Sequence, residues 1–185
     1  MRIIKLNEQS RANILADLLK RDPNNYSAYE DTVQAIVDDV RARGDEALFE
    51  YTKKFDGAEL SADNIRVTQA EIQEALSQVD PNLLAVMKKS MKNIREYHEK
   101  QKQYSWFDSK PNGTILGQKV TALSSVGVYV PGGKAAYPSS VLMNIIPAEV
   151  AGVEKIVMVT PPGKDGKVNP VTLIAAHLAG ATEVY

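Results

Sequence analysis

The stretch Val126-Gly127-Val128-Tyr129-Val130-Pro131-Gly132-Gly133 decides the fold. It begins as a short uncharged run that is rich in β-branched residues and ends in a proline-glycine turn. A continuous apolar run bounded by turn residues is typical of a strand buried in a parallel sheet. We therefore predict a buried strand over 126–130, followed by a loop over 131–138.

The chain after this strand alternates between helical and strand patterns. We expect a helix capped by Ser139 or Ser140, running to about Val153 and kinked at Pro147, a strand over 155–160, a helix over 170–178 ending at Gly180, and a strand over 182–185. The order β-α-β-α-β is that of a parallel sheet with helical crossovers, so the fold class is α/β. Three strands and two helices rarely cover both faces of such a sheet. We therefore expect the intact protein to continue beyond Tyr185 and the isolated chain to self-associate.

The residues before this region are densely charged and follow helical periods. The predicted features are an apolar stripe over Ile14–Leu19, a capping box of Ser27 with Glu30 whose helix Gly44 ends, a helix capped by Asp45 and ending before Gly57, a capping box of Thr68 with Glu71, and a long helix opened by Asp80-Pro81 with a stripe ending at His98. Asn112-Gly113 predicts a hairpin, with 115–123 as its better strand. We place the domain boundary between a helical layer over 1–105 and an α/β domain over 106–185.

Composition excludes several classes of function. The 185 residues are 44% hydrophobic and 24% charged, with a formal net charge of −1, so nothing suggests a nucleic-acid partner. The absence of cysteine excludes disulfides, zinc ribbons and thiol catalysis within the segment. The N-terminus has no apolar signal core, and the apolar stretches are too short to span a bilayer. We expect a soluble cytoplasmic protein with no membrane partner.

The glycine-rich loop after the first strand is the candidate binding site. Tyr129 and Gly132 lie at the carboxyl end of a strand, where open α/β sheets bind ligands, and a helix start follows with free backbone N–H groups. The stretch is not the GxGxxG fingerprint, and spacing alone favours a tight turn with a core tyrosine.

Other polar residues have structural explanations. His98 and His177 lie in predicted helices without metal-ligand spacing, so we interpret them as surface or core-edge residues. The charges of Arg41-Ala42-Arg43-Gly44-Asp45-Glu46 suit the end of one helix and the start of the next. Lys134 stays unassigned.

Three blocks of the sequence resemble the histidinol dehydrogenase family. They are Val40 to Leu48 with Tyr51, Phe55 and Asp56; Ala85 to His98; and Ser125 to Gly133, continued by Tyr137-Pro138-Ser139-Ser140-Val141-Leu142-Met143 and Pro147-Ala148. The third block is the most specific. The resemblance covers nearly the whole chain from about residue 25, but less than half of a full-length family member.

The resemblance implies an enzyme that oxidises L-histidinol through the aldehyde to L-histidine with two NAD and one zinc ion. It implies that the zinc ligands and the catalytic acid–base pair lie beyond residue 185, with none in this segment. The family's NAD-contacting tyrosine falls on Tyr129, and Pro131 and Gly132 complete that motif. It also implies a homodimer with two incomplete Rossmann-like domains, of which 1–105 and 106–185 are the first parts.

Two alternatives remain at this level. A relative with the same fold could oxidise another alcohol, such as a sulfonated propanediol, because the substrate-reading residues lie past Tyr185. A helical adaptor without enzymatic activity would need a self-contained core and would bind no ligand at the Tyr129 loop.

Overall fold

The computed structural model describes residues 7–12, 26–132 and 136–185. The chain forms two units, Met1–Leu48 and Phe49–Tyr185. The first unit contains helix α2 (Ser27–Arg43), and α3 (Asp45–Phe55) runs across the division. The predicted stripe over Ile14–Leu19 lies outside the described residues. The elements of the second unit are α4 (Gln69–Gln78), α5 (Pro81–Glu99), β1 (Trp106–Ser109), β2 (Ile115–Gln118), β3 (Ser125–Tyr129), α6 (Pro138–Val150), β4 (Lys155–Val159), α7 (Pro170–Ala179) and β5 (Glu183–Val184).

Three helices begin with a side chain that caps the backbone N–H groups of the first turn. The Thr68 hydroxyl accepts a hydrogen bond from the Glu71 N–H, and the Glu71 carboxylate accepts one from the Thr68 N–H, which is the predicted capping box. Asp80 caps α5 ahead of a proline at the first helical position. Asn169 caps α7 in the same way, accepting from the N–H groups of Val171 and Thr172. These side chains satisfy N–H groups that have no partner inside the helix.

Three predicted caps are wrong. Helix α3 begins at Asp45 itself, so this residue lies inside the helix and not in the cap position. Helix α2 begins at Ser27 itself, so the residue in the cap position is Tyr26, which makes no side-chain capping bond. Helix α6 begins at Pro138, which places Ser139 and Ser140 inside its first turn and Tyr137 in the cap position without a capping bond. Proline fits a first turn because its missing N–H would be unpaired there, and this moves the start ahead of the serines. The helix also ends at Val150, earlier than expected.

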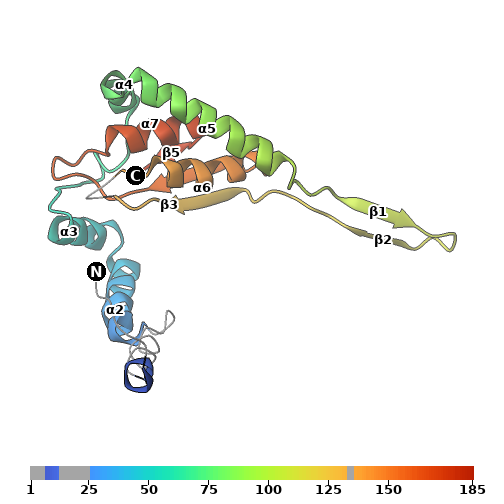
Figure 1. Ribbon diagram of the computed structural model, residues 1–185, viewed down its shortest axis with the longest axis horizontal. Helices are drawn as coiled ribbons and strands as arrows, with labels where there is room; N and C mark the ends of the chain where they lie inside the picture. The colour runs from blue at the N-terminus through green and yellow to red at the C-terminus, as the bar shows by residue number, and fades with distance from the viewer. Residues whose placement is uncertain (1–6, 13–25, 133–135) are drawn as a thin grey trace. The chain divides into compact units, whose positions relative to one another are not determined.

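The three strands of the α/β region form a parallel sheet in the order β3-β4-β5, as predicted. Both connections, through α6 and α7, progress in the same direction across the sheet. Right-handed crossovers that progress in one direction place their helices on one face. Figure 1 shows α4, α5, α6 and α7 on the same side of the sheet. Helices α6 and α7 pack together, α5 packs on α6, and α4 packs on α7.

The core lies between the sheet and these helices. Val130 of the β3 end, Ile156 and Met158 of β4, and apolar residues of α6 and α7 are buried, and Ile72, Ala75 and Met87 of the outer helices join the same cluster. Burial of this apolar surface is the main stabilising contribution to the unit.

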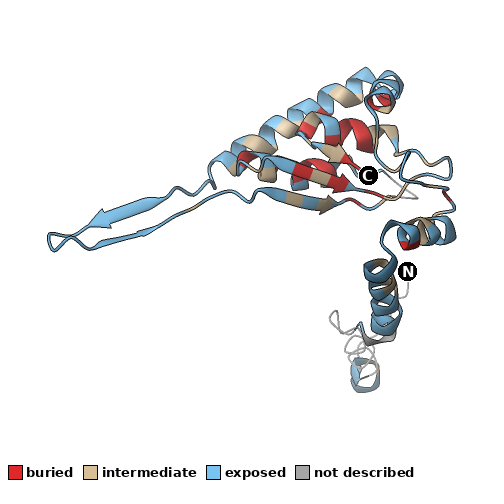
Figure 2. Ribbon diagram, turned by 180° about the vertical axis from the view of Figure 1, so that it is seen from behind, coloured by how far each residue is buried: buried red, intermediate tan, exposed pale blue. Residues whose placement is uncertain are grey.

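The opposite face of the sheet is open. In β3, Val126 and Val128 are partly buried, whereas Ser125, Gly127 and Tyr129 are exposed. Figure 2 shows the exposed residues of β3 as pale blue segments between the tan ones. The prediction of a buried strand is therefore wrong for this face of β3, because no described element of the same unit covers it. The β5 edge is partly covered, since the Val67 N–H donates to the Val184 carbonyl at 2.9 Å.

The hairpin predicted at Asn112-Gly113 is present. Strands β1 and β2 pair antiparallel, and Gly113 has a positive φ of 83° in the turn. The second strand ends at Gln118, so it is shorter than the predicted 115–123. Every residue of both strands is exposed, and Figure 1 shows the hairpin extending away from the sheet and helices of its unit.

Candidate functional site

The candidate site lies where β3 and β4 end side by side. The parallel register pairs Tyr129 with Val159, so the chain leaves both strands at the same edge of the sheet. The Val130 N–H donates to the Val159 carbonyl at 3.0 Å, which extends the pairing by one residue. The loops that follow, Pro131-Gly132 and Thr160-Pro161-Pro162, begin together at this carboxyl edge, where open α/β sheets bind ligands.

A cleft of about 410 Å³ opens beside these two loops. Its walls come from α4, from the loop over 160–169 and from the start of α7. Gly132 is the residue of the glycine-rich turn that lines it. The polar lining residues are Glu71, Glu74, Gln78, Thr160, Asp165, Lys167, Asn169 and Thr172. Apolar residues such as Val67, Ala75 and Leu173 complete the lining, so the cleft is of mixed polarity.

Gly132 is in close contact with the second loop. A Cβ atom at this position would stand 2.8 Å from the Pro161 carbonyl oxygen and 3.3 Å from Pro161 Cδ. Only glycine allows this approach without displacing the loop. The absence of a side chain at Gly132 thus serves loop packing, in addition to any role toward a ligand.

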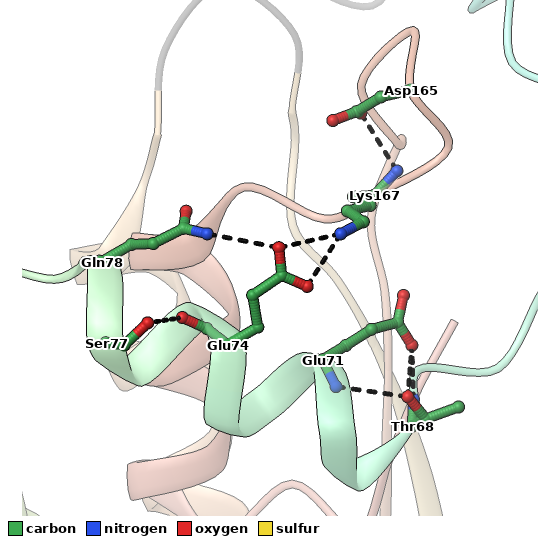
Figure 3. Close-up of polar contacts among 7 residues, drawn as sticks. All are labelled: Thr68, Glu71, Glu74, Ser77, Gln78, Asp165 and Lys167. Carbon is green, nitrogen blue, oxygen red and sulfur yellow. Dashed lines mark hydrogen bonds and ion pairs between the residues drawn. The ribbon is translucent and has the colours of Figure 1, made fainter.

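An ion pair joins α4 to the loop over 160–169. Lys167 Nζ lies 2.9 and 2.8 Å from the two carboxylate oxygens of Glu74, and Gln78 Nε2 donates to the same carboxylate at 3.4 Å (Figure 3). Hydrogen bonding to Glu74 and the charges of Glu74, Glu71 and Asp165 raise the pKa of Lys167 above its ordinary value. Lys167 is therefore a paired cation on the rim of a cleft that is otherwise acidic.

Tyr129 lies outside this cleft. Its side chain is 61% exposed, on the open face of the sheet and one residue before Val130. The interpretation of Tyr129 as a core residue is wrong, because side chains alternate along a strand and the odd-numbered residues of β3 face away from the helices. A Cβ atom added at Gly127, two residues earlier on that face, would meet no atom within 4 Å. The phenol ring thus borders open space at the carboxyl edge.

The structure brings the predicted residues to one edge, but not to one surface. Gly132 lines the cleft, Pro131 is exposed, and Tyr129 lies on the open sheet face. The first turn of α6 follows after 133–135, and Lys134 and Gly133 lie outside the described residues. The N–H groups of that turn receive no side-chain cap from Tyr137, so they remain available to an acceptor.

The remaining candidates lie elsewhere. His98 is partly buried near the end of α5, with its ring edge-on to Tyr97 at 5.2 Å, and His177 is exposed on α7. Arg43 makes two 2.7 Å bonds to Asp39 one turn earlier in α2, consistent with a structural role for the arginines there. Within the described part of the chain, no three histidine or acidic side chains gather as a metal site. None of its helices is long and apolar enough to cross a membrane.

Sequence reasoning missed the second half of the site. Thr160, Lys167 and Glu74 were not predicted as site residues. Thr160-Pro161-Pro162-Gly163 carried a usable signal, since it follows a parallel strand as directly as Pro131-Gly132 does. The partnership of Glu74 with Lys167 carried none, because 93 residues separate them.

The fold is that of an α/β protein with a parallel sheet, a class of fold in which ligands commonly bind at the carboxyl edge of the strands. The family model for histidinol dehydrogenase matches residues 19–185. A histidinol dehydrogenase of Heliobacterium mobile is 56% identical over 153 residues, and one of Bacillus subtilis is 58% identical over 154. Each match covers 83% of this chain and 36% of the relative. The chain belongs to the histidinol dehydrogenase family.

Comparison with solved structures agrees. The chain is similar to the crystal structure of histidinol dehydrogenase from Elizabethkingia anophelis, with a TM-score of 0.78 and 34% identity. That match covers 85% of this chain and 36% of the other. The chain therefore spans little more than a third of the length of these relatives.

Proposed function

We propose that the full-length protein of which this chain is the N-terminal part oxidises L-histidinol through the aldehyde to L-histidine, with two NAD and a zinc ion. The observation that carries the proposal is the family match over residues 19–185. The zinc ligands and the proton-transferring residues belong to the part of the protein after residue 185. In this proposal the present segment contributes no catalytic or metal-binding residue.

The role of this segment is to contact NAD through Tyr129, Pro131 and Gly132. The exposed position of Tyr129 supports this role, because an aromatic ring beside open space can stack on a flat group or donate its hydroxyl hydrogen. The uncapped first turn of α6 supports it as well, since free N–H groups at a helix start favour anions such as a pyrophosphate. NAD supplies the hydride acceptor when it is bound, and the turn holds and orients it.

The organisation of the intact protein is part of the same proposal. Residues 1–105 begin a first incomplete Rossmann-like domain, and 106–185 begin the NAD-binding domain. The protein acts as a cytoplasmic homodimer.

The proposal is tested with purified full-length protein. We expect NADH formation from L-histidinol, with two NADH per histidine formed, and loss of activity when a chelator removes zinc. A sulfonated propanediol is the comparison substrate and should support little turnover. NADH formation from the propanediol but not from histidinol would assign the protein to the other alcohol. Turnover of neither substrate by a folded, zinc-loaded protein would contradict the proposal.

A further inference from the structure

We propose that Glu74 and Lys167 are positioning residues, whose ion pair fixes the turn after β3 for cofactor binding. The inference rests on the proposed function, and it concerns one residue of α4 and one of the loop between β4 and α7. Its physical basis is a series of contacts from α4, through the loop over 160–169, to Gly132.

Both ends of the loop over 160–169 are fixed by hydrogen bonds. Its middle segment needs a further contact to hold it in place. Its first residues follow β4 directly, where Thr160 N–H donates to the Tyr185 carbonyl at 3.0 Å. Pro161 and Pro162 restrict the next two φ angles. At the other end, the Asn169 side chain caps α7. The segment between them, 163–168, is exposed or partly exposed and contacts solvent on one side.

This middle segment is folded into a tight turn that is closed by hydrogen bonds to and from Lys167. The Gly163 N–H donates to the Lys167 carbonyl at 2.8 Å, and the Gly166 N–H donates to the Gly163 carbonyl at 2.9 Å. The Lys167 N–H donates to Asp165 Oδ1 at 3.1 Å (Figure 3). Holding Lys167 in place therefore also holds Gly163, which lies two residues from Pro161.

The ion pair anchors this turn to α4. Glu74 lies in the middle of a helix whose start is fixed by the Thr68 capping box and whose inner face is buried through Ile72 and Ala75. The two Lys167–Glu74 contacts of 2.9 and 2.8 Å thus connect the loop to a rigid element. Since Pro161 packs against Gly132, the position of the loop sets that of the turn after β3. Pro131 belongs to this turn, and Tyr129 is the last residue of the strand before it.

The test uses the full-length enzyme with Lys167→Met, Glu74→Gln and the double variant that carries both changes. Lys92→Met is the matched control, because Lys92 also pairs with a glutamate, Glu96, but within α5. We expect each single variant to raise KM for NAD about two- to five-fold, the range of a half-exposed ion pair. The kcat at saturating NAD and KM for histidinol should stay unchanged. The double variant should be no more impaired than either single one, because each single change already removes the ion pair, and Lys92→Met should behave as wild type.

Amide hydrogen exchange gives a readout that does not depend on turnover. In Lys167→Met we expect faster exchange at Gly163 and Gly166, with protection in α5 and α6 unchanged. A KM for NAD equal to that of Lys92→Met, or a double variant that loses the sum of the two single effects, would overturn the inference. Unchanged exchange at the two glycines would do the same. Wild-type enzyme that does not reduce NAD would contradict the proposed function instead, and the exchange experiment would still report whether the pair holds the loop.

Discussion

Gly132 and Pro161 meet so closely that a Cβ atom on the glycine would stand 2.8 Å from the proline carbonyl oxygen. The contact joins the two loops that leave the carboxyl edge of the sheet. It explains a glycine at this position by packing, and it connects the turn bearing the proposed cofactor residues to the loop lining the cleft.

Gly132→Ala should therefore destabilise the protein. The new methyl group must displace the Pro161 backbone, and overpacking of this kind costs about 1–3 kcal/mol. Chemical denaturation of the 185-residue chain, followed by circular dichroism, measures the change in the free energy of unfolding.

Gly127→Ala is the matched control for that experiment. Gly127 lies in β3 with nothing within 4 Å of an added Cβ atom, so alanine should be neutral or slightly stabilising. If the Gly132→Ala and wild-type chains had the same free energy of unfolding, the loop could move away from the methyl group at no cost. That result would contradict the close packing of Gly132 against Pro161.

Glu183 in β5 gives the stability of the sheet a defined pH dependence. Its carboxylate lies 3.2 Å from Lys155 Nζ and 3.3 Å from Arg66 Nη2, and the Tyr185 hydroxyl donates to it at 3.1 Å. Hydrogen bonding from Lys155 is the largest influence that lowers the pKa of Glu183 below 4.5, with Tyr185 and Arg66 acting in the same direction.

A carboxyl group whose pKa is lower in the folded state stabilises the fold above its unfolded pKa. This contribution is complete above about pH 4.5 and disappears as the pH falls through the lower, folded pKa. Glu183→Gln should therefore reduce Tm at pH 7 but should narrow its difference from wild type as the pH is lowered toward 3. Thermal melts over this range provide the measurement. Glu154→Gln, in the exposed loop before β4, is the control, and a pH-independent difference for Glu183→Gln would contradict the assignment.

The hairpin of β1 and β2 offers a spectroscopic prediction. Trp106 is the one tryptophan of the sequence, and it is 56% exposed at the start of β1. The dilute 185-residue chain should show the red-shifted emission of a hydrated indole and efficient quenching by acrylamide. A lone two-stranded hairpin is marginally stable in water. The tryptophan fluorescence should therefore show its thermal transition at a lower temperature than the helical circular dichroism signal does. A blue-shifted, poorly quenched emission would show that the indole is buried.

The sequence predicted those elements whose boundaries are set by local chemistry. The caps at Thr68 and Asp80 and the turn at Asn112-Gly113 all act over two or three residues, so the pattern alone was sufficient. The parallel order of the three strands followed from their alternation with helices.

The predictions that failed depend on contacts between residues that are far apart in the sequence. The apolar run 126–130 does not reveal that both crossovers lie on one face, and so it could not place Tyr129 on the open face. Ser27 and Ser139 resemble caps in the sequence, but each helix begins one residue or more earlier than such caps require. The Glu74–Lys167 pair depends on tertiary packing of α4 against the second loop, which no spacing rule encodes.

The proposed function depends most directly on Tyr129 as a contact for NAD at an edge of the sheet. The decisive measurement is the KM for NAD of the full-length enzyme carrying Tyr129→Ala or Tyr129→Phe. Because the ring is exposed, neither change should alter the stability of the core. The account predicts that alanine raises KM for NAD about five-fold, as expected for losing one stacking or hydrogen-bonding contact, that phenylalanine raises it less, and that KM for histidinol stays the same. Unchanged NAD kinetics in a folded Tyr129→Ala enzyme would contradict it.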